Sequence, residues 1–238
     1  MFNLKEKFEF LEDGTDIPFY NGIPKLSKIE WFILLAAVIL MAINITTKIL
    51  PLIDNLFPII FCLLGVVPAL YVCKGNYSIF FKIPRLKDVK LIIGCVIANY
   101  LYTIIIAILL LALGVDLASH SSSSSAPTLA SYTFQAIQLW GEEFFKIFLL
   151  LLIMFGVYKY TNNRKLSLIS GILVTLIVFG LLHYNAYGGK IIQILLIQGF
   201  GSIFELYAYL QTKNVVVSYL IHLIVDSIPD IINVLNLG

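Results

Sequence analysis

The sequence predicts an all-α, polytopic transmembrane helix bundle with about seven spanning helices, and two observations carry this prediction. Hydrophobic residues make up 60% of the 238 residues, charged residues only 13%, and the mean hydropathy is +0.94. A soluble domain averages about 25% charged residues, so lipid must solvate most of this chain. The apolar runs are continuous and about twenty residues long, unlike the alternating ten-residue segments of a β-barrel.

The expected spans are separated by charged or turn-forming stretches. Trp31 is an aromatic anchor at the start of the first span, and Pro51 closes it. Pro58 and Pro68 lie inside the second span, where neighbouring helices of a bundle can accommodate them. The seven expected spans are Glu30–Leu50, Phe57–Val72, Val89–Leu113, Tyr132–Val157, Leu166–Tyr184, Ile191–Leu210 and Val215–Val234.

The chain divides into four regions by composition. Residues 1–28 mix both signs of charge and are predicted to form a soluble N-terminal arm. Residues 29–113 hold the first three transmembrane helices, and residues 114–131 form a Ser-rich linker without Lys or Arg. Residues 132–238 hold the last four helices, which carry the candidate catalytic residues.

Basic residues predict the orientation in the membrane. The loop between the second and third spans is the most basic of the chain, so the positive-inside rule places it in the cytoplasm. Its cations are Lys74, Lys82, Arg85, Lys87 and Lys90. The N-terminus is then cytoplasmic and the Ser-rich linker lies on the opposite side. The net charge of +2 says little about partners, and no stretch resembles a nucleic-acid-binding face.

Two adjacent carboxylates, Glu142 and Glu143, lie inside the fourth span. Roughly ten residues separate them from Tyr132, which places them about 15 Å deep, beyond the reach of a short side chain to the interface. Ionisable groups at that depth are expensive and indicate a functional site. The alternative is a snorkelling charge at a helix end, with Glu142 paired to Lys146 one turn later.

Two of the three histidines lie on later spans. His183 follows Phe179 by one helical turn, and His222 precedes Asp226 by one turn, so each pair shares a helix face. A lone histidine in a membrane helix is more often a hydrogen-bonded core residue than a ligand. Two histidines together with a buried carboxylate pair favour a site.

These residue types fit a catalytic zinc ion. Such a site uses three His or carboxylate ligands and leaves one position for water. Glu142, His183 and His222 supply that set, and Glu143 is then the general base that takes the proton of the water and passes it to the leaving amine. Asp226 would orient His222 or the water, or join the coordination shell.

The three motifs resemble those of the CPBP family. They are the Glu142–Glu143 pair, the Phe-x-x-x-His of Phe179 to His183, and the His-x-x-x-Asp that ends at Asp226. This family of intramembrane metalloproteases groups type II CAAX prenyl proteases with bacterial bacteriocin-processing and self-immunity proteins, also called the Abi family. The motifs come in the order of the family.

The resemblance implies a membrane-embedded zinc endopeptidase that cleaves a peptide or protein substrate near or within the membrane. One position departs from the family, whose first motif usually ends in Arg where this chain has Ile147, with Lys146 one place earlier. The departure bears on substrate preference more than on the metal site. The expected role is bacterial peptide or protein maturation or bacteriocin self-immunity, in a multi-pass protein of the plasma membrane.

Two other hypotheses stay open at this stage. One is a non-catalytic membrane scaffold or immunity protein of the same fold that binds a partner peptide, which Ile147 favours. The other is a proton-coupled transporter in which Glu142, Glu143 and His183 form a proton relay. Glu205 is expected to snorkel at the cytoplasmic end of its span; the alternative is that it lines the cavity of the site together with Gln193 and Gln198.

Overall fold

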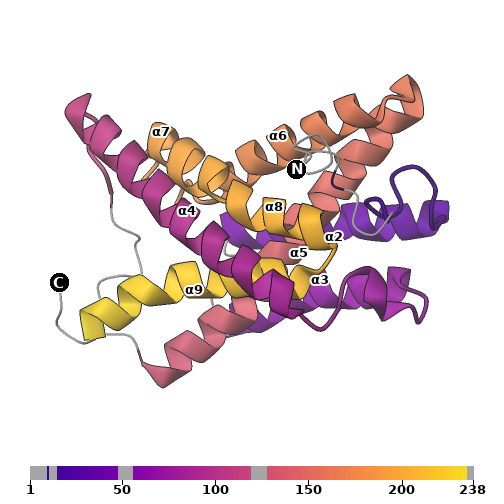
Figure 1. Cartoon of the computed structure of the whole chain (residues 1–238), viewed down its shortest axis with the longest axis horizontal. Helices are drawn as coiled ribbons and strands as arrows, with labels where there is room; N and C mark the ends of the chain where they lie inside the picture. The colour runs from indigo at the N-terminus through magenta and orange to yellow at the C-terminus, as the bar shows by residue number, and fades with distance from the viewer. Residues whose placement is uncertain (1–9, 11–14, 48–55, 119–127, 235–238) are drawn as a thin grey trace.

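The computed structural model describes residues 10, 15–47, 56–118 and 128–234 (Figure 1). Helices joined by short loops make up this part of the chain, which confirms the predicted all-α bundle. The helices are α2 (Lys28–Thr47), α3 (Phe57–Val72), η2 (Tyr77–Ile79), α4 (Leu86–Ala112), α5 (Leu129–Thr161), α6 (Arg164–Leu182), α7 (Ile191–Gln193), η3 (Ile194–Gly199), α8 (Ile203–Thr212) and α9 (Val215–Val234).

Five stretches of the described residues are helical, long and apolar enough to cross a membrane, as expected of a multi-pass membrane protein. They are Lys28–Thr46, Leu86–Ala112, Leu129–Thr161, Arg164–Leu182 and Ile191–Thr212. Two shorter apolar helices, Phe57–Val72 and Val215–Pro229, accompany them. Each of the seven predicted spans therefore falls on a helix or, for the sixth, on the continuous run of α7, η3 and α8. The serines of the linker, residues 119–125, lie outside the described residues.

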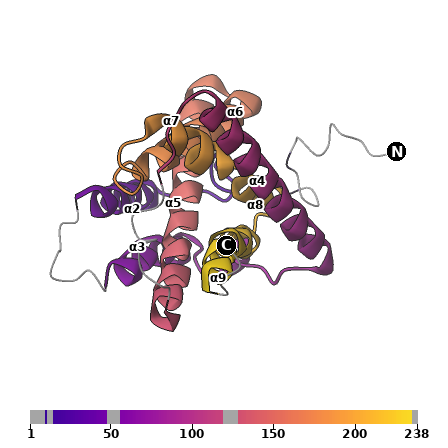
Figure 2. The ribbon, with the colours of Figure 1, turned by 90° about the vertical axis from the view of Figure 1, so that its left-hand side faces the viewer.

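Helix α5 is the centre of the bundle and packs against α2, α3, α6 and α9 (Figures 1 and 2). It begins three residues earlier than predicted because Thr128 and Ser131 cap it reciprocally, each side chain bonding the backbone N–H of the other. Glycines let its neighbours approach closely. A Cβ on Gly65 of α3 would lie 2.8 Å from Cβ of Phe144 in α5.

The sixth span is irregular. Residues Ile194–Gly199 form a π-helix, in which backbone hydrogen bonds skip one residue more than in an α-helix. Gly180 of α6 lies against Gly199 here, and a Cβ on Gly180 would meet the carbonyl oxygen of Ile194 at 2.7 Å. The hydroxyl of Ser202 donates to the carbonyl oxygens of Gln198 and Gly199. Side-chain bonding of this kind satisfies backbone groups that an irregular helix would leave unpaired in the membrane.

Helix α4 lies on the outside of the bundle, with α8 and α9 between it and α5 (Figure 2). Three polar side chains attach it to the irregular span and to α9. Asn99 donates to the carbonyl oxygen of Gly201, Tyr102 to that of Leu196, and Tyr100 to that of Val225. The bond from Tyr100 reaches the part of α9 that carries the candidate residues.

The described part of the N-terminal arm packs against the bundle. Ile17, Phe19 and Tyr20 are buried, and the ring of Tyr20 makes an edge contact with Tyr158 near the end of α5. Asp16 accepts hydrogen bonds from the Arg164 guanidinium at 2.6 and 3.0 Å and from the Tyr20 hydroxyl at 2.7 Å. Residues 15–27 thus tie the start of α2 to the turn between α5 and α6. Residues 1–9 and 11–14 lie outside the described part.

Asp16 gives this attachment an acid dependence. Burial on its own would raise the pKa of Asp16, but the hydrogen bonds from Arg164 and Tyr20 hold it below its ordinary value of 3.8. A carboxyl with a lowered folded-state pKa contributes stability that is present above the unfolded value and is lost as the pH falls through the folded value. We therefore expect Asp16→Asn to lower the free energy of unfolding by about 1 kcal/mol at pH 6. The value is small because the ion pair of Asp16 and Arg164 is partly exposed.

Thermal unfolding in detergent from pH 6 to pH 3 measures this effect. The difference between wild type and Asp16→Asn should shrink as the pH falls below 3.8. Asp116→Asn, at an exposed acid, is the control and should leave the pH profile unchanged. A difference between wild type and Asp16→Asn that stays constant across the range would contradict the prediction.

Candidate functional site

A group of seven polar side chains meets inside the bundle, between α5, α8 and α9; we call it the polar cluster. Six of the seven are buried or nearly so, and Asp226 is 36% exposed. Because the surrounding side chains are apolar, these groups must satisfy one another. The polar cluster consists of Glu142, Glu143 and Lys146 of α5, Glu205 of α8, and Ser218, His222 and Asp226 of α9.

Glu143 has three donors on its carboxylate. Oε1 accepts from Nδ1 of His222 and from Nζ of Lys146, each at 2.7 Å, and Oε2 accepts from the hydroxyl of Ser218. A carboxylate offers about four acceptor sites, so most of those of Glu143 are filled. Glu143 is therefore placed to hold other side chains in position.

Lys146 joins α5 to α8 and α6. Its ammonium contacts the carboxylates of Glu143 and Glu205 and lies 4.7 Å above the ring of Phe179. The side chain is 1% exposed, so this cation is fully removed from solvent. Glu205 is buried with it, and the prediction that Glu205 snorkels to the membrane surface is wrong. The ammonium of Lys146, on α5, pairs with Glu205 and makes its burial tolerable.

His222 presents its two ring nitrogens to different partners. The carboxylate of Glu143 can only accept when ionised, so Nδ1 carries the proton that this bond needs. The lone pair of neutral His222 is then on Nε2, which lies 3.8 Å from Glu142 Oε2 and 3.7 Å from Asp226 Oδ2. Glu142 also accepts from the amide of Gln138 at 2.8 Å.

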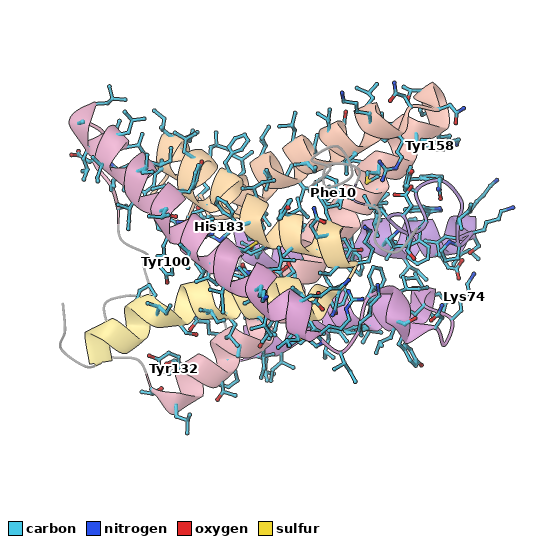
Figure 3. The ribbon with its side chains drawn as sticks, viewed as in Figure 1. Phe10, Lys74, Tyr100, Tyr132, Tyr158 and His183 are labelled. Carbon is cyan, nitrogen blue, oxygen red and sulfur yellow. The ribbon has the colours of Figure 1, made fainter. Side chains whose placement is uncertain are left out.

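His183 lies at the C-terminal end of α6, on the same side of the view in Figure 3 as Tyr132 and opposite to Lys74. Its Nδ1 is 3.0 Å from the carbonyl oxygen of Phe179, which can only accept. Neutral His183 therefore also has its lone pair on Nε2. The Phe179 ring links the two histidines, with centroid distances of 4.9 Å to His183 and 6.4 Å to His222.

Tyr187 is a further candidate that the sequence reasoning missed. It lies in the loop between α6 and α7, and its ring centroid is 6.3 Å from that of His183. Burial raises the pKa of Tyr187 to about 12, and the carboxylates of Asp226 and Glu142 add to the rise. The four-residue spacing from His183 was the only sequence signal.

The predicted site residues are brought together to different degrees. The predicted spans placed Glu142, His183 and His222 over a spread of roughly 15 Å in depth, at about 1.5 Å per residue. In the structure, Glu142, Glu143 and Asp226 each lie within 3.8 Å of a ring nitrogen of His222. The crossing of α5 and α9 brings them to one level. His183 adjoins this group through the ring of Phe179.

The polar cluster has two positions that suit a cation. The first is lined by ligand atoms of Glu143, Glu205 and His222, which all lie within 4.8 Å of one another. The second lies beside Nε2 of His222, facing Glu142 and Asp226. Each of these two carboxylates lies within about 4 Å of Nε2, the largest separation of two atoms that bind one zinc ion. Among the described residues, only the first position brings three ligand atoms within 4.8 Å of one another. The ammonium of Lys146 already contacts both carboxylates of the first position.

Formal charge in the polar cluster is unbalanced. Four carboxylates face the single ammonium of Lys146 when both histidines are neutral. Uncompensated charge is expensive inside a membrane protein, so these groups must take up protons or bind a cation. The chemistry open to the site is therefore metal-assisted or proton-transferring.

Comparison with known proteins does not narrow the possible functions of the chain. No family model, curated protein or solved structure matches the chain. Assignment of a role to the chain therefore depends on the geometry of the polar cluster and on the order of its motifs.

Proposed function

We propose that the chain is a membrane-embedded, zinc-dependent endopeptidase that cleaves a peptide or protein substrate near or within the membrane. The observation that carries the proposal is the shared arrangement of His183 and His222. Each places Nδ1 against an oxygen and keeps its lone pair on Nε2. Histidines that bind metals nearly always donate the other ring N–H to a carboxylate or a backbone carbonyl in this way.

The donor types suit the ion. Glu142, His183 and His222 would hold zinc, because carboxylate and imidazole are ligands that zinc prefers and the unbalanced negative charge favours a divalent cation. Zinc bound there would supply a Lewis acid that makes water nucleophilic at neutral pH.

The carboxylates then divide into two roles. Glu143 holds His222 through Nδ1 and is itself held by Lys146 and Ser218. Asp226 is the most exposed carboxylate of the polar cluster and faces Nε2 of His222, so its Oδ2 is placed to accept a proton from a water molecule at that point. We therefore assign the general base to Asp226 and a positioning role to Glu143, the residue that the sequence pattern predicted as base.

The resemblance to the CPBP family supports the same chemistry. The three motifs that resemble those of the family lie on α5, at the end of α6 and on α9, and Ile147 stands where the family usually has Arg. Lys146 supplies a cation from the neighbouring position. The proposed setting is a bacterial plasma membrane with a cytoplasmic N-terminus, and the proposed role is peptide maturation or bacteriocin self-immunity.

Metal content tests the proposal. We expect about one zinc ion per chain in protein purified in detergent without chelator, measured by mass spectrometry. His183→Ala and His222→Ala should each lower the content at least tenfold, because each removes a ligand. Glu143→Gln should keep the metal, since Gln can still accept from Nδ1. His120→Ala, at the third histidine, is the matched control.

Other results would separate the alternatives. Wild-type protein without metal would overturn the peptidase proposal. Proton uptake by proteoliposomes that is lost in Glu142→Gln would then point to the transporter. Peptide binding that survives every one of these substitutions would indicate the scaffold.

A further inference from the structure

The first cation position contains a cation that belongs to the chain. Glu143, Glu205 and His222 offer three buried ligand atoms within 4.8 Å of one another, the donor types that bind zinc. The ammonium of Lys146 contacts both of these carboxylates. A bound metal and this ammonium would compete for the same oxygen atoms.

Three features keep Lys146 in this position. Its side chain is 1% exposed and is therefore shielded from solvent. The ring of Phe179 lies 4.7 Å from Nζ and adds a cation–π contact. The two carboxylates come from different helices, α5 and α8, so movement of Lys146 would leave two buried carboxylates without the ammonium that they share.

We propose that Lys146 is a tethered cation that excludes metal ions from the group of Glu143, Glu205 and His222. The ammonium neutralises one of the two carboxylates and leaves a single net negative charge. It also keeps Glu143 Oε1 on Nδ1 of His222, so that Nε2 alone is directed towards Glu142 and Asp226. Exclusion concerns the first position and does not require the proposed function. The statement that a metal binds at Nε2 of His222 instead rests on the proposed function.

A charge-matched variant tests the exclusion. Lys146→Met combined with Glu205→His removes the ammonium and one carboxylate, so the net charge of the group is unchanged. Glu143, His222 and the introduced imidazole then form a two-histidine, one-carboxylate ligand set without a competing cation. We expect this variant to bind about one more equivalent of zinc or cobalt per chain than wild type, and cobalt to show the visible absorption of a protein-bound ion. Where Nε2 of His222 also holds a metal, Nδ1 must release its proton to the solvent so that the ring bridges the two ions as an imidazolate.

The matched control is Lys146→Met combined with Glu205→Leu. It has the same net charge but lacks a ligand at position 205, so it should bind the same number of equivalents as wild type. Equilibrium dialysis against cobalt and zinc gives the count for all three proteins. Size-exclusion chromatography and thermal unfolding select the variants that fold.

The measurement separates this inference from the proposed function. The number of equivalents in wild type tests the peptidase, and the difference between variant and wild type tests the tethered cation. A folded Lys146→Met, Glu205→His variant with no additional equivalent would overturn the inference. If that variant does not fold, Lys146→Gln provides the second test: metal should raise its melting temperature more than that of wild type, and an equal rise overturns the inference.

Discussion

Replacement of Lys146 by Met should lower the free energy of unfolding by about 3–5 kcal/mol, the largest effect that we expect from a single substitution. The change leaves the carboxylates of Glu143 and Glu205 buried without the ammonium that both contact. This loss of stability comes from leaving a buried charge uncompensated. It is therefore larger than the net stabilisation that the intact ion pair contributes.

A double-mutant cycle isolates this coupling. Glu205→Leu should cost less than Lys146→Met, because Lys146 keeps Glu143 as a partner. The double variant should be more stable than Lys146→Met alone, since the second change removes a charge that the first left unpaired. Chemical unfolding in mixed detergent micelles gives the four free energies. Lys159→Met, at an exposed lysine of the same helix, is the control and should lie within about 0.5 kcal/mol of wild type.

Additive free energies in this cycle would contradict the geometry. They would mean that Lys146 and Glu205 contribute to stability independently. The tethered-cation inference would then lose its structural basis, whatever the metal content of the wild type.

Substitution of Gly141 by Ala should have the second-largest effect. A Cβ at this position would lie 2.3 Å from Cδ1 of Phe61 and 2.6 Å from the carbonyl oxygen of the same residue. A side chain can rotate away, but the backbone of α3 cannot move without separating from α5. We expect a loss of about 1–3 kcal/mol or more, because overpacking a tight helix contact forces a backbone shift.

Gly156→Ala is the matched control for this prediction. It lies on the same helix, and no atom falls within 4 Å of an added Cβ. Alanine in an open helical position favours the helix by up to about 1 kcal/mol, so the control should be neutral or stabilising. Equal effects of the two substitutions would show that helix propensity, and not the α3–α5 contact, governs both positions.

Much of the helical architecture was predictable from local pattern. Long apolar runs must be helical in lipid because every backbone group has to be satisfied within its own segment. The basic turns therefore mark boundaries that the structure reproduces within a few residues, whereas Pro51 and the serines of the linker lie outside the described residues. The π-helix at Ile194–Gly199 was not predictable, because it depends on the close contact of Gly199 with Gly180 on another helix.

The candidate site was predictable in its residues and not in its contacts. Glu142, Glu143, His222 and Asp226 stood out because ionisable groups are rare and expensive in membrane spans. Glu205 carried the same signal, but its position near a span end favoured snorkelling. In the structure, α8 directs Glu205 to the ammonium of Lys146. Tyr187 carried no comparable signal, because a tyrosine in a loop is ordinary.

The sequence by itself determined that this chain is a helical membrane protein and which ionisable groups lie within its spans, because hydropathy and spacing are local properties of a segment. Only the tertiary structure decided which of these groups meet, which nitrogen of each histidine carries the proton, and where Lys146 lies. Those properties depend on how far one helix is shifted and tilted against the next, and that packing is set by glycines and large side chains on separate segments.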